Sequence, residues 1–114
     1  MKTGTEREAE IIKMLEALFA ARKTALAKHR VVLFGSRARG NAKQRSDFDL
    51  GVDGDEPLGI QQFFEIEEAL EGLPTLYSFD WVDLAKTNNR FREEALKTVR
   101  VLYDGRRHSA GTRA

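Results

Sequence analysis

A glycine-serine turn followed by two aspartates in one predicted strand is the feature that most constrains how this chain can fold. The apolar run 31–34 predicts a short buried strand, which Gly35 ends. Asp47 and Asp49 lie two residues apart in a second predicted strand, so they share one face, with Cα atoms about 6.5–7 Å apart. The opposite face of that strand is apolar and carries Phe48, Leu50 and Val52. The second strand is therefore expected to bury one face and keep its carboxylates on the other, beside the turn.

The two carboxylates and the turn together favour a site for metal and phosphate. Adjacent carboxylates repel each other unless a cation lies between them, and Mg²⁺ binds one or two carboxylates together with substrate phosphate oxygens. The turn adds backbone N–H groups, the hydroxyl of Ser36 and the guanidinium groups of Arg37 and Arg39, which all suit phosphate. A basic hairpin loop and a strand with a polar outer face would explain each half separately. Their combination in this order favours a nucleotide site.

A later segment, 75–84, predicts a strand that carries a third acid. Asp80 would share the open face with the first two aspartates, because the large aromatic residues of this strand should face the helices: Tyr77, Phe79 and Trp81. Asp83 falls on the aromatic side near the end of the strand, where a cap or a turn is expected. An exposed aspartate on an edge strand remains the alternative reading of Asp80.

Composition limits the remaining possibilities. The 114 residues predict one domain, and the formal net charge of +1 does not indicate direct nucleic-acid binding. The absence of cysteine excludes disulfides and thiolate zinc sites. No apolar run approaches the roughly 20 residues of a membrane span, and residues 1–10 are too polar for a secretory signal. We therefore expect a cytoplasmic protein with no membrane contact.

The expected fold is α+β, a small mixed sheet with helices packed on one face and the acids on the open face. Hydrophobic periodicity predicts three helices and a last short strand, over 6–28, 59–71, 88–98 and 101–103. A polar loop is expected over 41–46, one domain over 1–105 and a flexible tail over 106–114. Three further polar residues are expected to be solvated or to lie on a charged helix face: His29, Asp53 and Arg92.

The motifs resemble a known signature. The pattern resembles the signature of the DNA polymerase β-like nucleotidyltransferase superfamily, above all that of its minimal nucleotidyltransferases. It consists of the stretch from Leu33 to Ser36, a ten-residue gap and the stretch from Asp47 to Leu50. The resemblance covers about residues 8–105. It implies that Gly35 and Ser36 hold the triphosphate of ATP or another NTP. It also implies that two Mg²⁺ ions, or Mn²⁺ in their place, are held by three acids: Asp47, Asp49 and Asp80.

The resemblance also implies an activity and a partner. Such a protein would transfer a nucleoside monophosphate, here AMP from ATP, to a hydroxyl group. These 114 residues leave no room for a domain that holds an acceptor, so we expect another polypeptide to supply it. Minimal nucleotidyltransferases are often encoded beside a helical HEPN-domain protein, and in known pairs the transferase is an antitoxin that attaches AMP to a tyrosine of that ribonuclease. Two alternatives stay open: a catalytically silent module that neutralises a HEPN partner by contact, and a free-standing transferase acting on a small molecule.

Overall fold

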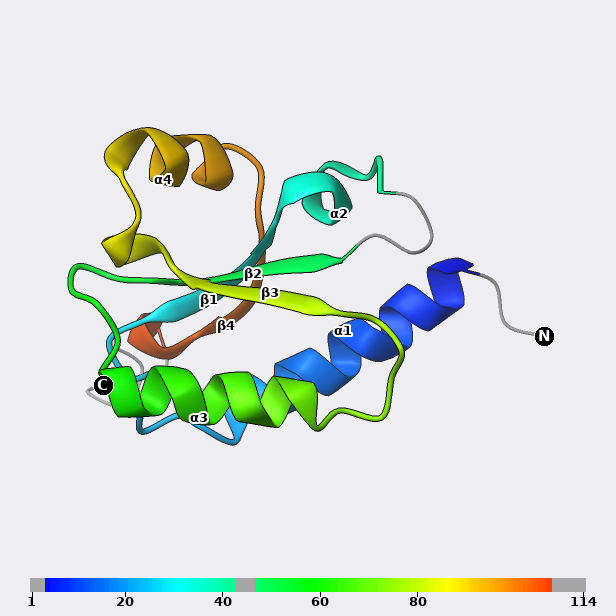
Figure 1. Ribbon diagram of the computed structural model, residues 1–114, viewed down its shortest axis with the longest axis horizontal. Helices are drawn as coiled ribbons and strands as arrows, with labels where there is room; N and C mark the ends of the chain where they lie inside the picture. Colours follow the sequence, from blue (N-terminus) through cyan, green and yellow to red (C-terminus); the bar gives the residue numbers. More distant parts are fainter. Residues whose placement is uncertain (1–3, 43–46, 108–114) are drawn as a thin grey trace.

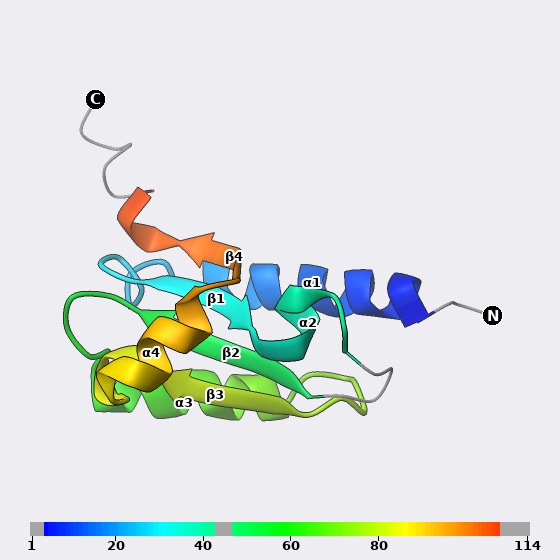
Figure 2. The same ribbon diagram turned by 90° about the horizontal axis from the view of Figure 1, so that it is seen from above.

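Four strands form a mixed sheet at the centre of the molecule, in the order β3-β2-β1-β4 (Figures 1 and 2). The computed structural model describes residues 4–42 and 47–107. β1 runs antiparallel to both β2 and β4, whereas β3 is parallel to β2, so the predicted mixed sheet is confirmed. The strands are β1 (Arg30–Phe34), β2 (Phe48–Asp53), β3 (Phe79–Asp83) and β4 (Arg100–Asp104).

Two helices, α1 (Gly4–Ala20) and α3 (Ile60–Glu71), cover one face of the sheet (Figure 1). Most of their apolar residues recur at helical spacing and are buried against the sheet, whereas Ile60 and Phe64 of α3 are exposed. Trp81 of β3 stacks between Phe19 and Phe63, with ring centroids 5.7 Å and 5.4 Å away. The apolar face of β2 meets this layer as predicted, through Phe48, Leu50 and Val52.

The opposite face is not fully open, which corrects the prediction that helices pack on one face alone. α4 (Asn89–Leu96) lies over it, and Phe91 meets the ring of Phe34 edge to face at 6.1 Å. Leu84, at the start of the short 3-10 helix η1 (Leu84–Lys86), packs so closely on Gly51 that a Cβ there would lie 2.8 Å from its Cδ1. α4 and η1 thus cover apolar residues on this face, while Asp80, near the beginning of β3, stays exposed.

The first predicted helix is too long. α1 ends at Ala20, and residues 21–28 form turns in place of the helix predicted to continue to 28. The guanidinium of Arg22 donates to the carbonyl of Leu18 at 2.8 Å and so satisfies one of the free acceptors at the helix end. The turns place Leu26 in the core, at the seven-residue spacing from Phe19 that a continuing helix would also give.

The predicted strand over 75–84 is also too long, because its first residues form a local turn. The N–H of Thr75 donates to the carbonyl of Leu73, and the N–H of Tyr77 donates to the hydroxyl of Thr75. The remaining helices and the last strand begin and end within two residues of their predicted bounds. No helix in the described part of the chain is both long and apolar enough to cross a membrane.

Part of the predicted loop and most of the predicted tail lie outside the described residues, at 43–46 and 108–114. The N–H groups of Arg106 and Arg107 donate to the carboxylate of Asp104, at 3.1 Å and 3.2 Å. The division into a domain over 1–105 and a tail remains a prediction.

Candidate active site

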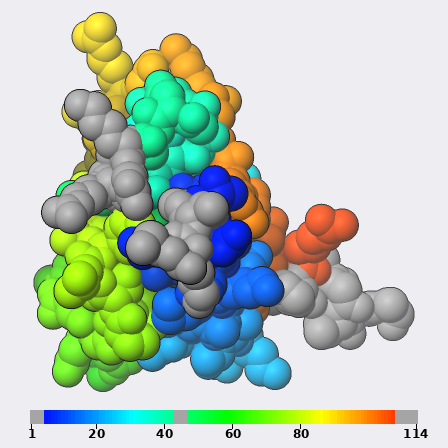
Figure 3. All heavy atoms as spheres, turned by 90° about the vertical axis from the view of Figure 1, so that its right-hand side faces the viewer, coloured from blue at the N-terminus to red at the C-terminus, as the bar shows by residue number. Residues whose placement is uncertain are grey.

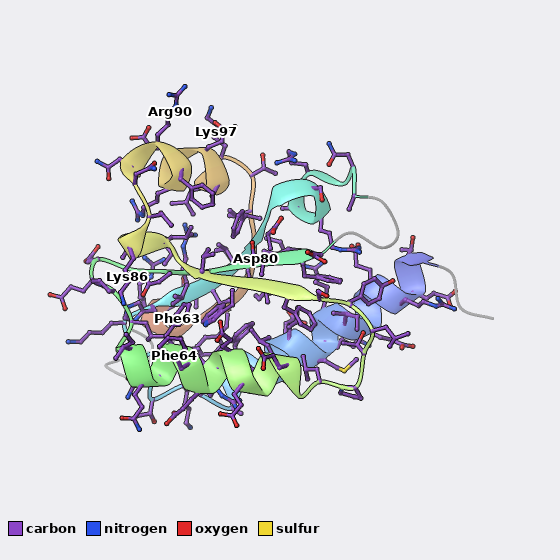
Figure 4. All side chains as sticks on the ribbon, viewed as in Figure 1. Phe63, Phe64, Asp80, Lys86, Arg90 and Lys97 are labelled. Atoms are coloured by element: carbon purple, nitrogen blue, oxygen red, sulfur yellow. The ribbon has the colours of Figure 1, made fainter. Side chains whose placement is uncertain are left out.

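The candidate site lies at the end of the sheet where β1 ends and where β2 and β3 begin. The register pairs Phe34 with Asp49 across β1 and β2, and Asp49 with Asp80 across β2 and β3. Neighbouring strands lie about 4.8 Å apart, and paired residues point to the same face, so the two carboxylates are neighbours. Asp80 points to the side of the sheet away from α3 (Figure 4). The face predicted for Asp80 is therefore confirmed, while its chemical role remains a prediction.

Gly35 brings the backbone of the turn against the carboxylate of Asp49. Its φ is +73°, in the left-handed region, and a Cβ at this position would overlap Asp49 Oδ2 and lie 3.1 Å from Asp49 Cγ. The residues that follow form the short helix α2 (Gly35–Arg39), in which Ser36 is half-buried. Gly40, with φ of +78°, closes α2 and donates its N–H to the carbonyl of Ser36. The predicted turn is thus present and adjoins the first acid.

The acids carry uncompensated negative charge. Burial raises the pKa of Asp49 above its usual value, and the nearby carboxylates of Asp80 and Asp47 raise this pKa further. The guanidinium of Arg39 acts in the opposite direction on the pKa of Asp49 and offsets part of the rise. Asp47 and Asp80 are themselves exposed, so ligands from solvent have access to both.

The donor set fits a hard divalent ion. Carboxylate oxygens are the ligands that Mg²⁺ and Mn²⁺ prefer, and Mg²⁺ commonly takes one or two of them together with substrate phosphates. Asp49 and Asp80 are neighbours, and Asp47 is close enough to raise the pKa of Asp49. Within residues 4–42 and 47–107, however, no three acidic or histidine side chains are grouped tightly enough to enclose a metal ion. The fit therefore rests on ligand chemistry and on mutual repulsion that a cation would relieve.

The two arginines of α2 lie in different environments. Arg37 is buried, with its guanidinium carbon 4.1 Å from the ring centroid of Phe48 and 5.1 Å from that of Tyr77. Its Nη1 also donates to Glu8 of α1 at 2.7 Å. Arg37 thus anchors α2 to α1, whereas Arg39 is exposed and acts on Asp49. Figure 3 looks onto this end of the molecule, where α2 (cyan) lies above the first turns of α1 (dark blue).

A buried ion-pair cluster lies farther along the same face of β2. Asp53 is only 3% exposed and accepts hydrogen bonds from Arg30 at 3.0 Å and from Arg92 of α4 at 2.8 Å. The prediction of a solvated Asp53 is therefore wrong, because the arginine partners come from β1 and α4 and no local pattern indicates them. The same holds for His29, which is buried with Nε2 2.8 Å from the carbonyl oxygen of Glu56.

This cluster predicts a pH-dependent contribution to stability. Burial alone would raise the pKa of Asp53, but hydrogen bonds from Arg92 and Arg30 outweigh it and hold the pKa below its usual value. Because the pKa is lower in the folded state, the stabilisation is present above the unfolded value of about 3.9 and is lost as pH falls through the folded pKa. Asp53→Asn should lower the free energy of unfolding by about 1–3 kcal/mol at neutral pH.

Urea unfolding of both proteins between neutral pH and about pH 3 measures this difference. The gap between native protein and Asp53→Asn should shrink below about pH 4. Asp55→Asn, at an exposed residue nearby, serves as the control and should change stability little at any pH. A gap that stays constant across the range would show that the ion pairs do not stabilise the fold through the charge of Asp53.

The chain belongs to the polymerase beta nucleotidyltransferase family, because the sequence model of this family matches residues 16–108. Over 71 residues it is 35% identical to the probable protein adenylyltransferase MntA of Haemophilus influenzae, an alignment that covers 62% of each chain. The match therefore spans less than two thirds of that relative's length.

Solved structures share the fold. A toxin–antitoxin structure with AMP-PNP superposes with a TM-score of 0.58 and 19% identity, covering 83% of this chain and 77% of the other. The MNT antitoxin complex of the tri-AMPylated HEPN toxin of Shewanella oneidensis contains a chain that superposes with a TM-score of 0.50 and 20% identity. That match covers 95% of this chain and 78% of the other. The predicted α+β nucleotidyltransferase fold is thereby confirmed.

Proposed function

We propose that this protein is a divalent-metal-dependent nucleotidyltransferase that transfers AMP from ATP to a hydroxyl group of a partner protein in the cytoplasm. One observation carries the proposal: Asp49 and Asp80 are paired on neighbouring strands, and the backbone at Gly35 touches the carboxylate of Asp49. Membership of the polymerase beta nucleotidyltransferase family supports this reaction class. The Haemophilus relative is a probable protein adenylyltransferase, which supports AMP as the transferred group and a protein as the acceptor.

Each residue of the site has an assigned task. The triphosphate would lie against the backbone at Gly35 and Ser36, because glycine allows a ligand to approach the backbone closely. Arg39, whose charge acts on Asp49, would balance part of the charge of the triphosphate, and Arg37 holds α2 to α1 through Glu8. The divalent ions, two Mg²⁺ or Mn²⁺, would supply positive charge to the triphosphate and to the acceptor oxygen. Their ligands are Asp47, Asp49 and Asp80.

The transfer itself is a substitution at phosphorus. The acceptor hydroxyl oxygen forms a bond to the α-phosphorus of ATP while the bond from that phosphorus to the bridging oxygen of the β-phosphate breaks. Pyrophosphate leaves with the electron pair, and the hydroxyl proton passes to water. Phosphoryl transfer depends mainly on positioning and charge neutralisation, so no covalent nucleophile from this chain is required.

The proposed acceptor is a tyrosine of a HEPN-domain protein, to which this chain acts as antitoxin. The complex of the Shewanella HEPN toxin carries AMP groups on that toxin, and its antitoxin shares the fold of this chain. The exposed end of the sheet leaves Asp80 accessible to a side chain that arrives from another protein.

Mass spectrometry tests the proposal. The protein encoded by the neighbouring gene, which the proposal expects to be a HEPN-domain protein, is incubated with the native chain, Mg²⁺ and each NTP in turn. With ATP it should gain the mass of one or more AMP units and lose its nuclease activity.

The Asp49→Asn variant should bind the partner but leave it unmodified and active. If that variant neutralises the partner as well as native protein does, with no adduct in either sample, inhibition is by contact and the enzyme assignment is wrong. If no partner is modified and a small molecule is labelled instead, the chain is a free-standing transferase.

A further inference from the structure

A groove lies between α3 and the outer edge of β3, next to the candidate site. It has two hollows, of 490 Å³ and 270 Å³, and Trp81 lines both. The larger hollow is lined by Glu67 and Glu71 on one side and by Phe79 on the other, and the smaller one by Phe64 and Lys86. β3 is the last strand of the sheet on this side, so one long edge of it lies beside the groove (Figure 2).

The backbone of this edge is open to pairing. The N–H of Phe48 donates to the carbonyl of Ser78 at 3.0 Å, so that carbonyl faces β2. Successive residues of a strand turn their N–H and C=O groups to opposite sides, which directs those of Phe79, Trp81 and Asp83 away from β2. Among the described residues, no strand pairs with this edge. An open edge beside a helix is the setting in which extended peptides add as a further strand.

The side chains around the groove indicate what such a peptide carries. Ile60 is 61% exposed and Phe64 is 53% exposed, although both are large apolar residues of α3. α3 contains four glutamates and no lysine or arginine, and two of these glutamates, Glu67 and Glu71, line the larger hollow. The smaller hollow is mostly apolar and has exposed Lys86 at its far end. The complementary segment carries a basic residue on the Glu67 side and an apolar residue on the Phe64 side.

We propose that the groove binds an extended segment of the acceptor protein as a fifth strand on the β3 edge, with its acceptor hydroxyl beside Asp80. The inference rests on the proposed function, for which it names the form of the substrate. Asp80 points to the site face, whereas Phe79 and Trp81 point to the helices. A residue opposite Asp80 on an added strand would lie about 4.8 Å away on the same face, and its two neighbours would enter the hollows. One binding mode thus explains both the open edge and the two hollows.

Amide exchange measured by NMR tests the backbone part. The Asp49→Asn variant is used in complex with the partner protein of the proposed function, because the acceptor then stays unmodified. The N–H groups of Phe79, Trp81 and Asp83 should exchange at least about tenfold more slowly in the complex. Amides of β4, the other edge of the sheet, should exchange at unchanged rates. Unchanged exchange at Trp81 and Asp83 in a saturated complex would overturn the inference.

Steady-state kinetics test the side-chain part with native partner. Phe64→Ser, and separately Glu67→Lys combined with Glu71→Lys, should raise KM for the partner about tenfold and leave KM for ATP unchanged. Two matched controls lie outside the groove: Glu68→Lys on α3, and Val101→Ser, which changes an exposed apolar residue of β4. Groove variants that behave like their controls would contradict the inference.

A third measurement separates this inference from the proposed function. Short peptides with a tyrosine between lysine and valine, in either order, are titrated into native protein, and the fluorescence of the single tryptophan reports occupancy. Peptide binding that protects the β3 edge, without AMP transfer to any protein, would support the groove and refute the function. AMP transfer to a partner that leaves the β3 edge unprotected would support the proposed function and refute the groove as the binding site. Protection that appears on self-association alone would identify a second copy as the occupant and overturn the inference.

Discussion

Gly35→Ala is expected to reduce AMP transfer about a hundredfold or more, while Gly40→Ala retains most of it. Both glycines have φ in the left-handed region, +73° and +78°, so both substitutions carry a similar strain of about 1–2 kcal/mol. They differ in what the new methyl group meets. At Gly35 it overlaps the carboxylate of Asp49, and at Gly40 it finds nothing within 4 Å. A displacement of a reacting group by about 1 Å is enough to cost two orders of magnitude in rate.

The two variants are compared by the rate of AMP incorporation into the partner and by urea unfolding. Gly35→Ala should lose at least as much stability as Gly40→Ala, because the clash with Asp49 adds to the strain that both substitutions carry. The rates are therefore compared at a temperature where both variants stay folded. Nucleotide affinity should also fall for Gly35→Ala, because the added methyl group stands where the phosphate approaches the turn. Equal rates for the two variants would mean that the turn is a structural feature of the fold with no part in catalysis.

The face of each strand residue could be predicted from the sequence because it depends on a local rule. Side chains alternate along a strand, so the apolar Phe48 and Leu50 fix the face of Asp49, and the aromatic Trp81 fixes the face of Asp80. The structure pairs Asp49 with Asp80 on neighbouring strands, as those faces require. Gly35 could be predicted for a similar reason, since a sharp turn at the end of a buried strand calls for glycine.

Other features could not be predicted, because they depend on contacts between distant segments. Arg37 and Arg39 look alike in the sequence, but two residues are about 200° apart around a helix, and only the packing of α2 decides which one is buried. The partners of Asp53 come from β1 and from α4, and α4 lies on a face that the sequence indicated as open. α1 ends at Ala20 although Leu26 follows Phe19 at a helical spacing of seven residues, so periodicity alone does not reveal the end of the helix.

The two acids of β3 should respond in opposite ways to the same substitution. Asp80→Asn should reduce AMP transfer about a thousandfold, since a lost metal ligand removes several kcal/mol of charge stabilisation. Its stability should hold or rise, because the negative charge of Asp80 raises the pKa of Asp49 and is unfavourable in the metal-free protein. Asp83 is buried and accepts hydrogen bonds from the N–H groups of Leu58 at 2.8 Å and of Ala85 at 3.0 Å. Asp83→Asn should therefore lose about 1–3 kcal/mol of stability and keep its transfer rate.

Two measurements test whether Asp80→Asn loses activity and Asp83→Asn loses stability. AMP transfer is assayed at a temperature where all variants stay folded, and urea unfolding is measured in parallel. Asp80 and Asp83 lie in one strand and carry the same group, so neither composition nor net charge distinguishes the two variants. They differ only in the face that each side chain occupies and in its partners. Loss of transfer in Asp83→Asn with normal transfer in Asp80→Asn would place the metal ligand on the helix side of β3. The proposed site on the exposed face would then be wrong, and so would an acceptor segment that reaches it along the β3 edge.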